Sequence, residues 1–144
     1  MFASLDVEEN LLLPPRICDG GLSVAELYEL FPNIKARLRS PGTALSGGEQ
    51  QMLAIARILR TGARFLLLDE PTEGLAPVII KQIGATIRRL KESGFTMVLV
   101  VQSLPFATRV ADRHVIVERG RVVDRIHRDE MKGAAERLNR YLSV

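Results

Sequence analysis

Two apolar runs without polar alternation constrain the fold of this 144-residue chain more than any other feature. The first run is FLLL at 65–68, and the second is TMVLVV at 96–101. Runs of this kind are typical of parallel strands that are buried on both faces of a sheet. A helical pattern of apolar residues separates them, from Pro77 to Gly94. Strand, helix and strand in this order predict an α/β fold with a parallel sheet.

Capping signals place the helices in the first part of the chain. A Ser or Asp followed three residues later by Glu forms a capping box, in which each side chain bonds the other residue's backbone N–H. Boxes of this type predict helix starts after Asp6, Ser23 and Ser46, and Ser4 is an alternative cap for the first of these helices. The first two helices are expected to stop at Pro14 and Pro32, because proline lacks the N–H that a helix interior needs.

Proline and glycine positions place the shorter elements. We expect a brief helix over 34–39 and a helix from Pro105, at its first position, to about residue 111. A β-hairpin is expected over 114–124, and a final helix over 129–142.

Charge and residue content argue against several kinds of site. The net charge is +3, but no run of Lys or Arg exceeds two residues, which favours a solvated surface over a nucleic-acid interface. No apolar run approaches the ~18–20 residues that cross a bilayer, and a signal peptide pattern is lacking at the start. Cys18 is the one cysteine, so an internal disulfide is excluded and an inert thiol expected. His114 and His127 are expected on the surface.

The helix that follows Ser46 begins with two glycines, Gly47 and Gly48. Each glycine costs about 0.8–1 kcal/mol relative to alanine in a helix, and a capping box does not require them. Bare backbone N–H groups at the positive end of a helix dipole form a site that an anion such as phosphate can approach closely. We therefore predict an anion site here. We also expect an exposed helix terminus that tolerates a bulky residue at Gly48 without loss of the fold.

Two carboxylates, Asp69 and Glu70, follow the first apolar run. Open α/β sheets bind ligands beyond the carboxyl ends of their strands, and successive residues of a strand point in opposite directions. One carboxylate can therefore hold a metal ion while the other faces a water molecule. Mg²⁺ is the expected metal, because it prefers oxygen ligands and needs few from the protein when phosphate oxygens are present.

The order of these motifs resembles that of an ABC-type ATPase. LSGGEQQ at 45–51 resembles the ABC signature, and FLLLDEP at 65–71 resembles a Walker B strand with its catalytic glutamate. TEGL at 72–75 stands where the D-loop begins, and Gln102 stands at the switch-histidine position. The segments VEENLLL, YELFPNIK, SPGTALSGGEQQMLAIARIL and DEPTEGLAPVIIKQIG are similar to the ATP-binding subunits of branched-chain amino acid importers.

This resemblance implies a partial P-loop NTPase fold, with residues 1–144 as the C-terminal portion of one ABC ATPase domain. About 4–44 would form the helical subdomain, and 45–144 the signature helix, Walker B strand, switch region and C-terminal hairpin and helix. It implies an ATP-hydrolysing importer subunit that works as a head-to-tail dimer with a second ATPase subunit. The expected partners are transmembrane permease subunits, and the expected location is the cytoplasmic face of the inner membrane, as a peripheral protein.

The resemblance also implies a role for each candidate residue, with ATP and Mg²⁺ as cofactors. Glu70 would polarise the attacking water, Asp69 would help to hold Mg²⁺, and Gln102 would contact the γ-phosphate region. The residues that would serve the nucleotide of the opposite domain are Ser46, Gly47, Gly48 and Gln50. Phosphoryl transfer depends mainly on positioning and charge stabilisation, so no covalent nucleophile is needed.

Several family features are absent or changed. None of the 11 glycines is followed by lysine, so the Walker A loop G-x-x-x-x-G-K-[ST] is missing, and so is the Q-loop. We therefore expect the chain alone to be inactive. Val101 and Ser103 replace the importer branch's glutamate and asparagine, and Ala76 replaces a common D-loop aspartate. The alternatives are a non-catalytic fragment and a soluble ABC ATPase of DNA repair or translation, although the segment 23–40 resembles the importer branch.

Overall fold

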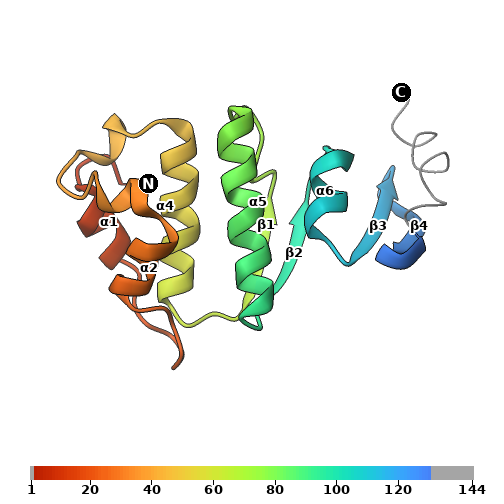
Figure 1. The fold of residues 1–144 in the computed structure, drawn as a ribbon, viewed down its shortest axis with the longest axis horizontal. Coiled ribbons are helices and arrows are strands. Elements are labelled where there is room, and N and C mark those ends of the chain that lie inside the picture. Colours follow the sequence, from red (N-terminus) through yellow and green to blue (C-terminus); the bar gives the residue numbers. More distant parts are fainter. Residues whose placement is uncertain (1, 131–144) are drawn as a thin grey trace. The chain divides into compact units, whose positions relative to one another are not determined.

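The computed structural model describes residues 2–130 and separates into two compact units, Met1–Val100 and Val101–Val144 (Figure 1). In the first unit, helices precede a strand–helix–strand segment. Among the described residues, no helix has the length and apolar character needed to cross a membrane. The elements of the first unit are α1 (Val7–Leu12), α2 (Val24–Leu30), α3 (Pro32–Lys35), a 3-10 turn (Gly42–Ala44), α4 (Gly47–Arg60), β1 (Phe65–Asp69), α5 (Pro77–Glu92) and β2 (Thr96–Val100).

The predicted helix starts are confirmed. Asp6, Ser23 and Ser46 are the N-caps of α1, α2 and α4, and each forms a complete capping box with the glutamate three residues later. The predicted short helix over 34–39 is wrong in its bounds, because α3 begins at Pro32. Proline is favoured in the first turn of a helix, where its missing N–H would have no partner, so Pro32 both ends α2 and starts α3.

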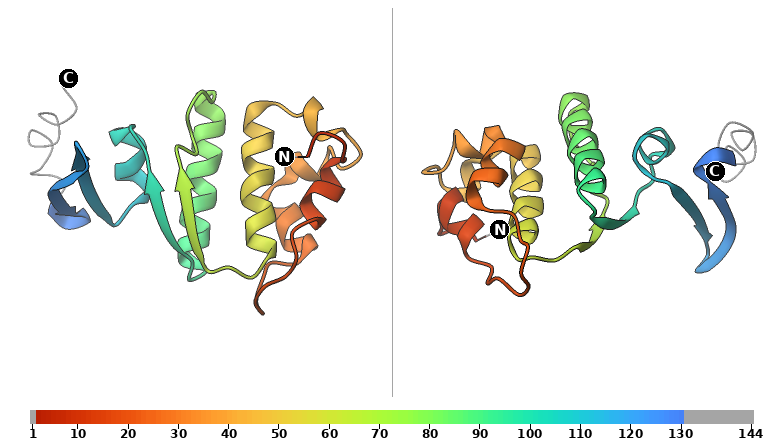
Figure 2. Two further views of the ribbon diagram at one scale, coloured as in Figure 1. Left: turned by 180° about the vertical axis from the view of Figure 1, so that it is seen from behind. Right: turned by 60° about the horizontal axis from the view of Figure 1, so that its bottom comes forward.

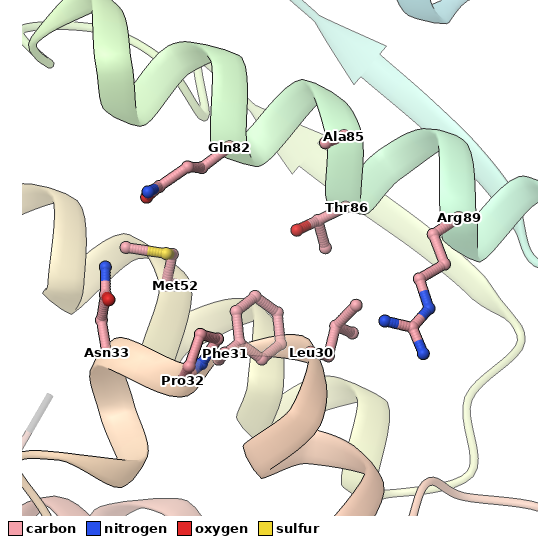
Figure 3. A pocket seen from close by; sticks show the side chains of 9 residues that line it. All are labelled: Leu30, Phe31, Pro32, Asn33, Met52, Gln82, Ala85, Thr86 and Arg89. Carbon is pink, nitrogen blue, oxygen red and sulfur yellow. The ribbon is translucent and has the colours of Figure 1, made fainter.

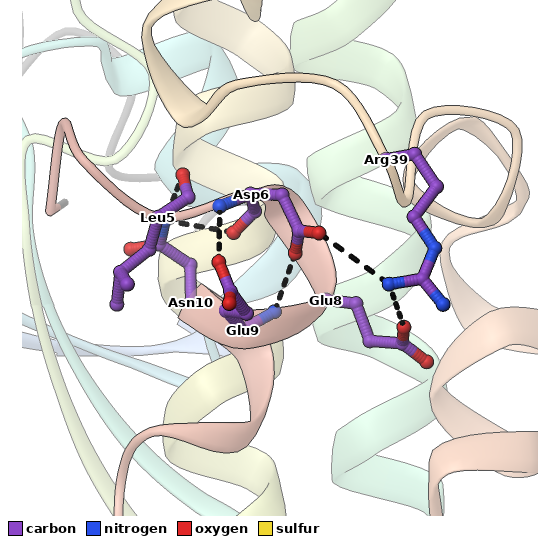
Figure 4. Close-up of polar contacts among 6 residues, drawn as sticks. All are labelled: Leu5, Asp6, Glu8, Glu9, Asn10 and Arg39. Carbon is purple, nitrogen blue, oxygen red and sulfur yellow. Dashed lines mark hydrogen bonds and ion pairs between the residues drawn. The ribbon is translucent and has the colours of Figure 1, made fainter.

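A buried asparagine joins the start of the chain to α1 (Figure 4). Asn10 is fully buried, and its amide nitrogen donates to the backbone oxygens of Phe2, Leu5 and Asp6 at 3.0–3.1 Å. Its Oδ1 accepts from the Phe2 N–H at 2.9 Å. These bonds offset the cost of burying a polar amide. Arg39, also shown in Figure 4, pairs with nearby carboxylates but is 81% exposed, so that pairing contributes little.

The predicted parallel sheet is confirmed, but the predicted burial on both faces is wrong. Strands β1 and β2 pair in parallel, with Leu67 opposite Val98, and α5 connects them and lies beside them (Figures 1 and 2). Leu66 and Leu68 are buried on one face of the sheet. The other face is apolar and open, because no element of the first unit covers it within the described residues. Its exposed side chains are Phe65 (57%), Leu67 (69%), Val98 (47%) and Val100 (56%).

The second unit contains the predicted hairpin. Strands β3 (Arg113–Glu118) and β4 (Arg121–His127) pair antiparallel. Arg119 and Gly120 form the two-residue turn, and both have positive φ, at 47° and 76°, as a type I′ turn requires. Helix α6 (Leu104–Val110) precedes the hairpin, with Pro105 as its second residue, and a 3-10 turn (Arg128–Glu130) follows it. The rest of the predicted final helix, at 131–142, lies outside the described residues.

His114 is not a surface residue, so that expectation is wrong, whereas the side chain of His127 is 49% exposed. Sequence alone could not reveal this, because β3 alternates between covered and open positions and His114 takes a covered one. The side chain is 9% exposed, and its Nε2 has no hydrogen-bond partner within the described residues. Burial lowers the pKa of His114, and the nearby Asp112 opposes this effect.

The lowered pKa of His114 predicts a loss of stability in mild acid. The unfolded chain takes up a proton near pH 6.5, whereas the buried imidazole resists it, so the free energy of unfolding decreases as the pH falls below about 6.5. We expect the difference in thermal midpoint between wild type and His114→Leu to change between pH 7 and pH 5, with wild type losing more. A constant difference over this range, measured by circular dichroism, would contradict the assignment.

Candidate functional site

The start of α4 presents unpaired donors. Gly47 and Gly48 are the first two helical residues, and no partner within residues 2–130 accepts a hydrogen bond from either N–H. The first N–H groups of a helix have no intrahelical acceptor. The Glu49 N–H, by contrast, donates to Ser46 Oγ at 3.4 Å. Two adjacent N–H groups at the positive end of a 14-residue helix are therefore without a partner in the described part of the chain, and the one at Gly47 is on an exposed residue that an anion can approach.

The Ser46 hydroxyl is exposed but already engaged. Its Oγ donates to Glu49 Oε2 at 2.7 Å, and the same carboxylate oxygen accepts the Ser46 N–H at 2.8 Å. The bond from the Ser46 hydroxyl is the main reason why the pKa of Glu49 is lowered. Glu49 is therefore ionised at neutral pH, and a phosphate that takes the Ser46 hydroxyl as a donor must compete with this carboxylate.

Gln50 hydrogen-bonds to the backbone just before α4. Its Nε2 donates to the backbone oxygen of Leu45 at 3.1 Å, so the side chain holds the residue that precedes the N-cap. This hydrogen bond orients the backbone at the start of α4. To bind a ligand through its amide nitrogen, the Gln50 side chain would have to break the bond to the Leu45 carbonyl.

The two glycines differ in their surroundings, and the expectation of an exposed terminus is wrong for Gly48. Gly47 is exposed, and a Cβ added there would lie 3.7 Å from Leu75 Cδ2, an ordinary contact. Gly48 is buried, and a Cβ there would lie 2.7 Å from Ile79 Cγ2, which is a clash. The absence of a side chain at Gly48 is thus required by the packing of α4 against α5. A bulky residue at this position would disturb the fold.

Asp69 lies at the carboxyl end of β1 and is exposed. No hydrogen bond to its carboxylate is formed within the described residues, so both oxygens are available to a cation. In the same part of the chain, no group of three or more His, Cys, Asp or Glu residues could hold a metal ion. A Mg²⁺ ion at Asp69 would therefore take its other ligands from water and from phosphate, which suits the coordination habits of this ion.

Glu70 has a strained backbone. Its φ is +41°, and within residues 2–130 only Arg119 shares this combination of a side chain with a positive φ. A left-handed conformation costs about 1–2 kcal/mol for a residue with a side chain. Two hydrogen bonds hold it, from the Glu70 N–H to the Val100 oxygen at 2.9 Å and from the Glu73 N–H to the Glu70 oxygen at 3.2 Å. Such strain persists mainly at functional sites.

Replacing Glu70 by glycine should stabilise the chain. Glycine removes the left-handed cost of about 1–2 kcal/mol and adds an entropic cost of folding of about 0.5–1 kcal/mol, so we expect a net gain of up to about 1.5 kcal/mol in unfolding free energy. Glu73→Gly is the matched control, because Glu73 is exposed and lacks a positive φ, and this variant should lose stability. Urea denaturation of both variants measures the effect, and an equal loss in both would refute the strain argument.

The candidate residues fall into two groups. The start of α4 and the loop after Glu70 lie together in the first unit, because Leu75 of that loop is next to Gly47. Gln102 is exposed and belongs to the second unit. Ile79, which faces Gly48, is not among the site residues predicted from the sequence. Its partner in α4 is a glycine, which has no side chain that could signal the contact in the sequence.

A cavity of about 240 Å³ lies apart from these residues (Figure 3). The corner between α2 and α3 lines it with Leu30 and Phe31, α4 contributes Met52, and α5 contributes Gln82 and Arg89 on the facing side. None of the candidate site residues lines this cavity. It is therefore separate from the anion site at the start of α4.

Comparisons with known proteins agree on one family. A family model described as ABC transporter matches residues 2–73, which is half of the chain. The "High-affinity branched-chain amino acid transport ATP-binding protein BraG" of Pseudomonas aeruginosa is 44% identical over 85% of this chain. The match includes 54% of BraG, so the chain spans little more than half the length of this relative.

Solved structures show the same fold. The structure of an ATP-binding subunit of an ABC transporter superposes with a TM-score of 0.74 at 26% identity, over 100% of this chain and 65% of that chain. A bacterial ABC transporter cassette, solved as a dimer, superposes with a TM-score of 0.72 at 27% identity, over 89% of this chain and 59% of that chain. These matches confirm the predicted fold class.

Proposed function

Because the chain belongs to the ABC transporter family, we propose that it forms part of an ATP-hydrolysing subunit that drives an importer of branched-chain amino acids. The observation that carries this proposal is the pair of unpaired N–H groups at Gly47 and Gly48, in the same unit as the strained Glu70. The name of the Pseudomonas relative supports the substrate class.

The proposed site uses each residue for one task. The start of α4, with Ser46 and the glycine N–H groups, binds the γ-phosphate of a nucleotide that another domain holds. Asp69 binds Mg²⁺ directly or through water, and Glu70 polarises the water that attacks the phosphate. Gln102 follows the second strand closely and contacts the γ-phosphate region. Since no residue forms a covalent intermediate, the rate depends on positioning and on charge stabilisation.

The proposal requires partners. A second ATPase subunit supplies the phosphate loop that faces the start of α4, and the dimeric structure of the related bacterial cassette supports such pairing. Transmembrane permease subunits bind the ATPase pair at the cytoplasmic face of the inner membrane. Neither the permease nor the second subunit is specified by the residues of this chain.

A hybrid cassette tests the proposal. In this hybrid, the chain replaces the matched portion of the Pseudomonas protein, which leaves the remainder of that protein to provide the phosphate loop. We expect Mg²⁺-dependent ATP hydrolysis by the purified hybrid, measured by phosphate release. A correctly folded hybrid that binds ATP and does not hydrolyse it above background would overturn the proposed function.

A further inference from the structure

We propose that Gly48 and Ile79 form a positioning contact that holds the loop between β1 and α5 against the start of α4. The missing side chain at the buried Gly48 then leaves room for Ile79, whereas the missing side chain at the exposed Gly47 leaves room for a phosphate. This inference rests on the proposed function only for its consequence, the placing of Glu70 and of the start of α4 at the bound nucleotides. The contact itself is observed in the structure and does not depend on the proposed function.

Ile79 packs closely against the bare backbone of Gly48. A Cβ at Gly48 would lie 2.7 Å from Ile79 Cγ2, 3.1 Å from Cγ1 and 3.4 Å from Cβ. Isoleucine is branched at Cβ and has one strongly preferred χ1 rotamer in a helix, so Ile79 cannot turn aside at low cost. An added methyl group at Gly48 therefore has to push α4 and α5 apart. Figures 1 and 2 show these two helices side by side.

The start of α5 depends on this contact, because it has no cap. Its N-cap residue is Ala76, and no side chain accepts a hydrogen bond from the first turn. Ile79 is the third residue of the helix, so packing against Gly48 fixes the helix where capping does not. Leu75, just before the N-cap, lies beside Gly47 and extends the contact along the loop.

The loop that is held in this way begins at Glu70. Glu70 keeps its left-handed backbone through bonds to Val100 and Glu73, and the chain reaches α5 only seven residues later, at Pro77. A displacement of Ile79 would therefore shift the backbone of this short segment, which includes the strained Glu70. Through this segment, the contact aligns the candidate catalytic glutamate with the end of α4 that meets the phosphate.

Unfolding of the chain itself tests the contact. Alanine is the better helix former, so Gly47→Ala should leave stability unchanged or raise it. Gly48→Ala should instead raise the unfolding equilibrium constant at least about fivefold, since residues in direct contact couple strongly. Ile79→Ala in the Gly48→Ala background should recover most of this loss, because a Cβ–Cβ distance of 3.4 Å is an ordinary contact. Equal behaviour of the two glycine variants would overturn the proposal.

Pairing of the hybrid cassette tests the consequence. ATP-dependent dimerisation should weaken at least about fivefold in Gly48→Ala, and Ile79→Ala should restore it to within about twofold. Restored pairing in the double variant would distinguish the positioning role from a direct phosphate contact at Gly48. If the Gly48→Ala change simply blocked the phosphate, shortening Ile79 would not remove the block. Failure of the rescue would overturn the positioning role. If the unmodified hybrid does not pair with ATP, the proposed function fails, while the unfolding comparison still decides whether the contact exists.

Discussion

The change Glu70→Gln should reduce ATP hydrolysis by the hybrid cassette at least about 100-fold while ATP binding is retained, which is the scale of a lost catalytic base. Glutamine has nearly the same shape as glutamate, so the strained backbone at this position is kept and only the charge and the basicity are lost. Phosphate release gives the turnover, and calorimetry gives the affinity for ATP.

Glu73→Gln provides the matched control for this result. Glu73 is exposed, lies three residues further along the same loop and has no assigned role, so its variant should hydrolyse ATP at nearly the wild-type rate. A Glu70→Gln hybrid whose turnover stays within a few-fold of wild type would show that Glu70 is not the catalytic base.

Ser46→Arg should abolish the ATP-driven pairing of two hybrid cassettes. The arginine side chain fills the space in which a phosphate would approach the Gly47 N–H, and it also removes the hydroxyl. Pairing is measured by size exclusion in the Glu70→Gln background, where the slow hydrolysis should preserve the dimer. We expect a dimer with ATP for the parent and a monomer for the Ser46→Arg variant.

The control for Ser46→Arg is Ser23→Arg. Ser23 forms the same capping box with Glu26 at the start of α2, so its loss costs the same kind of helix cap, about 0.5–2 kcal/mol. Only Ser46 has a proposed role in nucleotide binding. Retained pairing in both arginine variants would mean that Ser46 is a helix cap and nothing more, whereas loss in both would point to a general effect on stability.

Features that depend only on residues close together in the sequence could be predicted. The capping box from Ser46 to Glu49 spans four residues, and the hairpin turn at Arg119 and Gly120 spans two, so local chemistry decides both. The parallel pairing of the two apolar runs also followed from local patterns, because a strand–helix–strand order leaves few alternatives.

Features that depend on distant neighbours could not be predicted. The burial of Gly48 is set by Ile79, which is 31 positions away, and nothing at the glycine itself marks its partner. The apolar character of Leu67 predicted burial, yet only one face of its sheet is covered by described residues, and Leu67 is on the open face. His114 lacks a local signal altogether, since a polar side chain at a covered strand position contradicts the usual pattern.

The roles of Glu70, Asp69 and Gln102 remain predictions, but the backbone conformation supports a functional role for Glu70. Sequence motifs placed Glu70 after a strand, and only the structure adds the left-handed φ of 41° at this residue. A strained residue needs surroundings that hold it, and such residues gather at functional sites.

Binding of Mg-ATP, measured by titration calorimetry on the chain as it is and on the hybrid cassette, tests the central claim most directly. The claim is that this chain carries the signature end and the catalytic glutamate, whereas the main phosphate cradle is contributed by residues that it lacks, since its sequence contains no G-x-x-x-x-G-K. We predict micromolar binding by the hybrid and no measurable heat of binding for the chain alone. Micromolar binding of Mg-ATP by the chain alone would contradict the account.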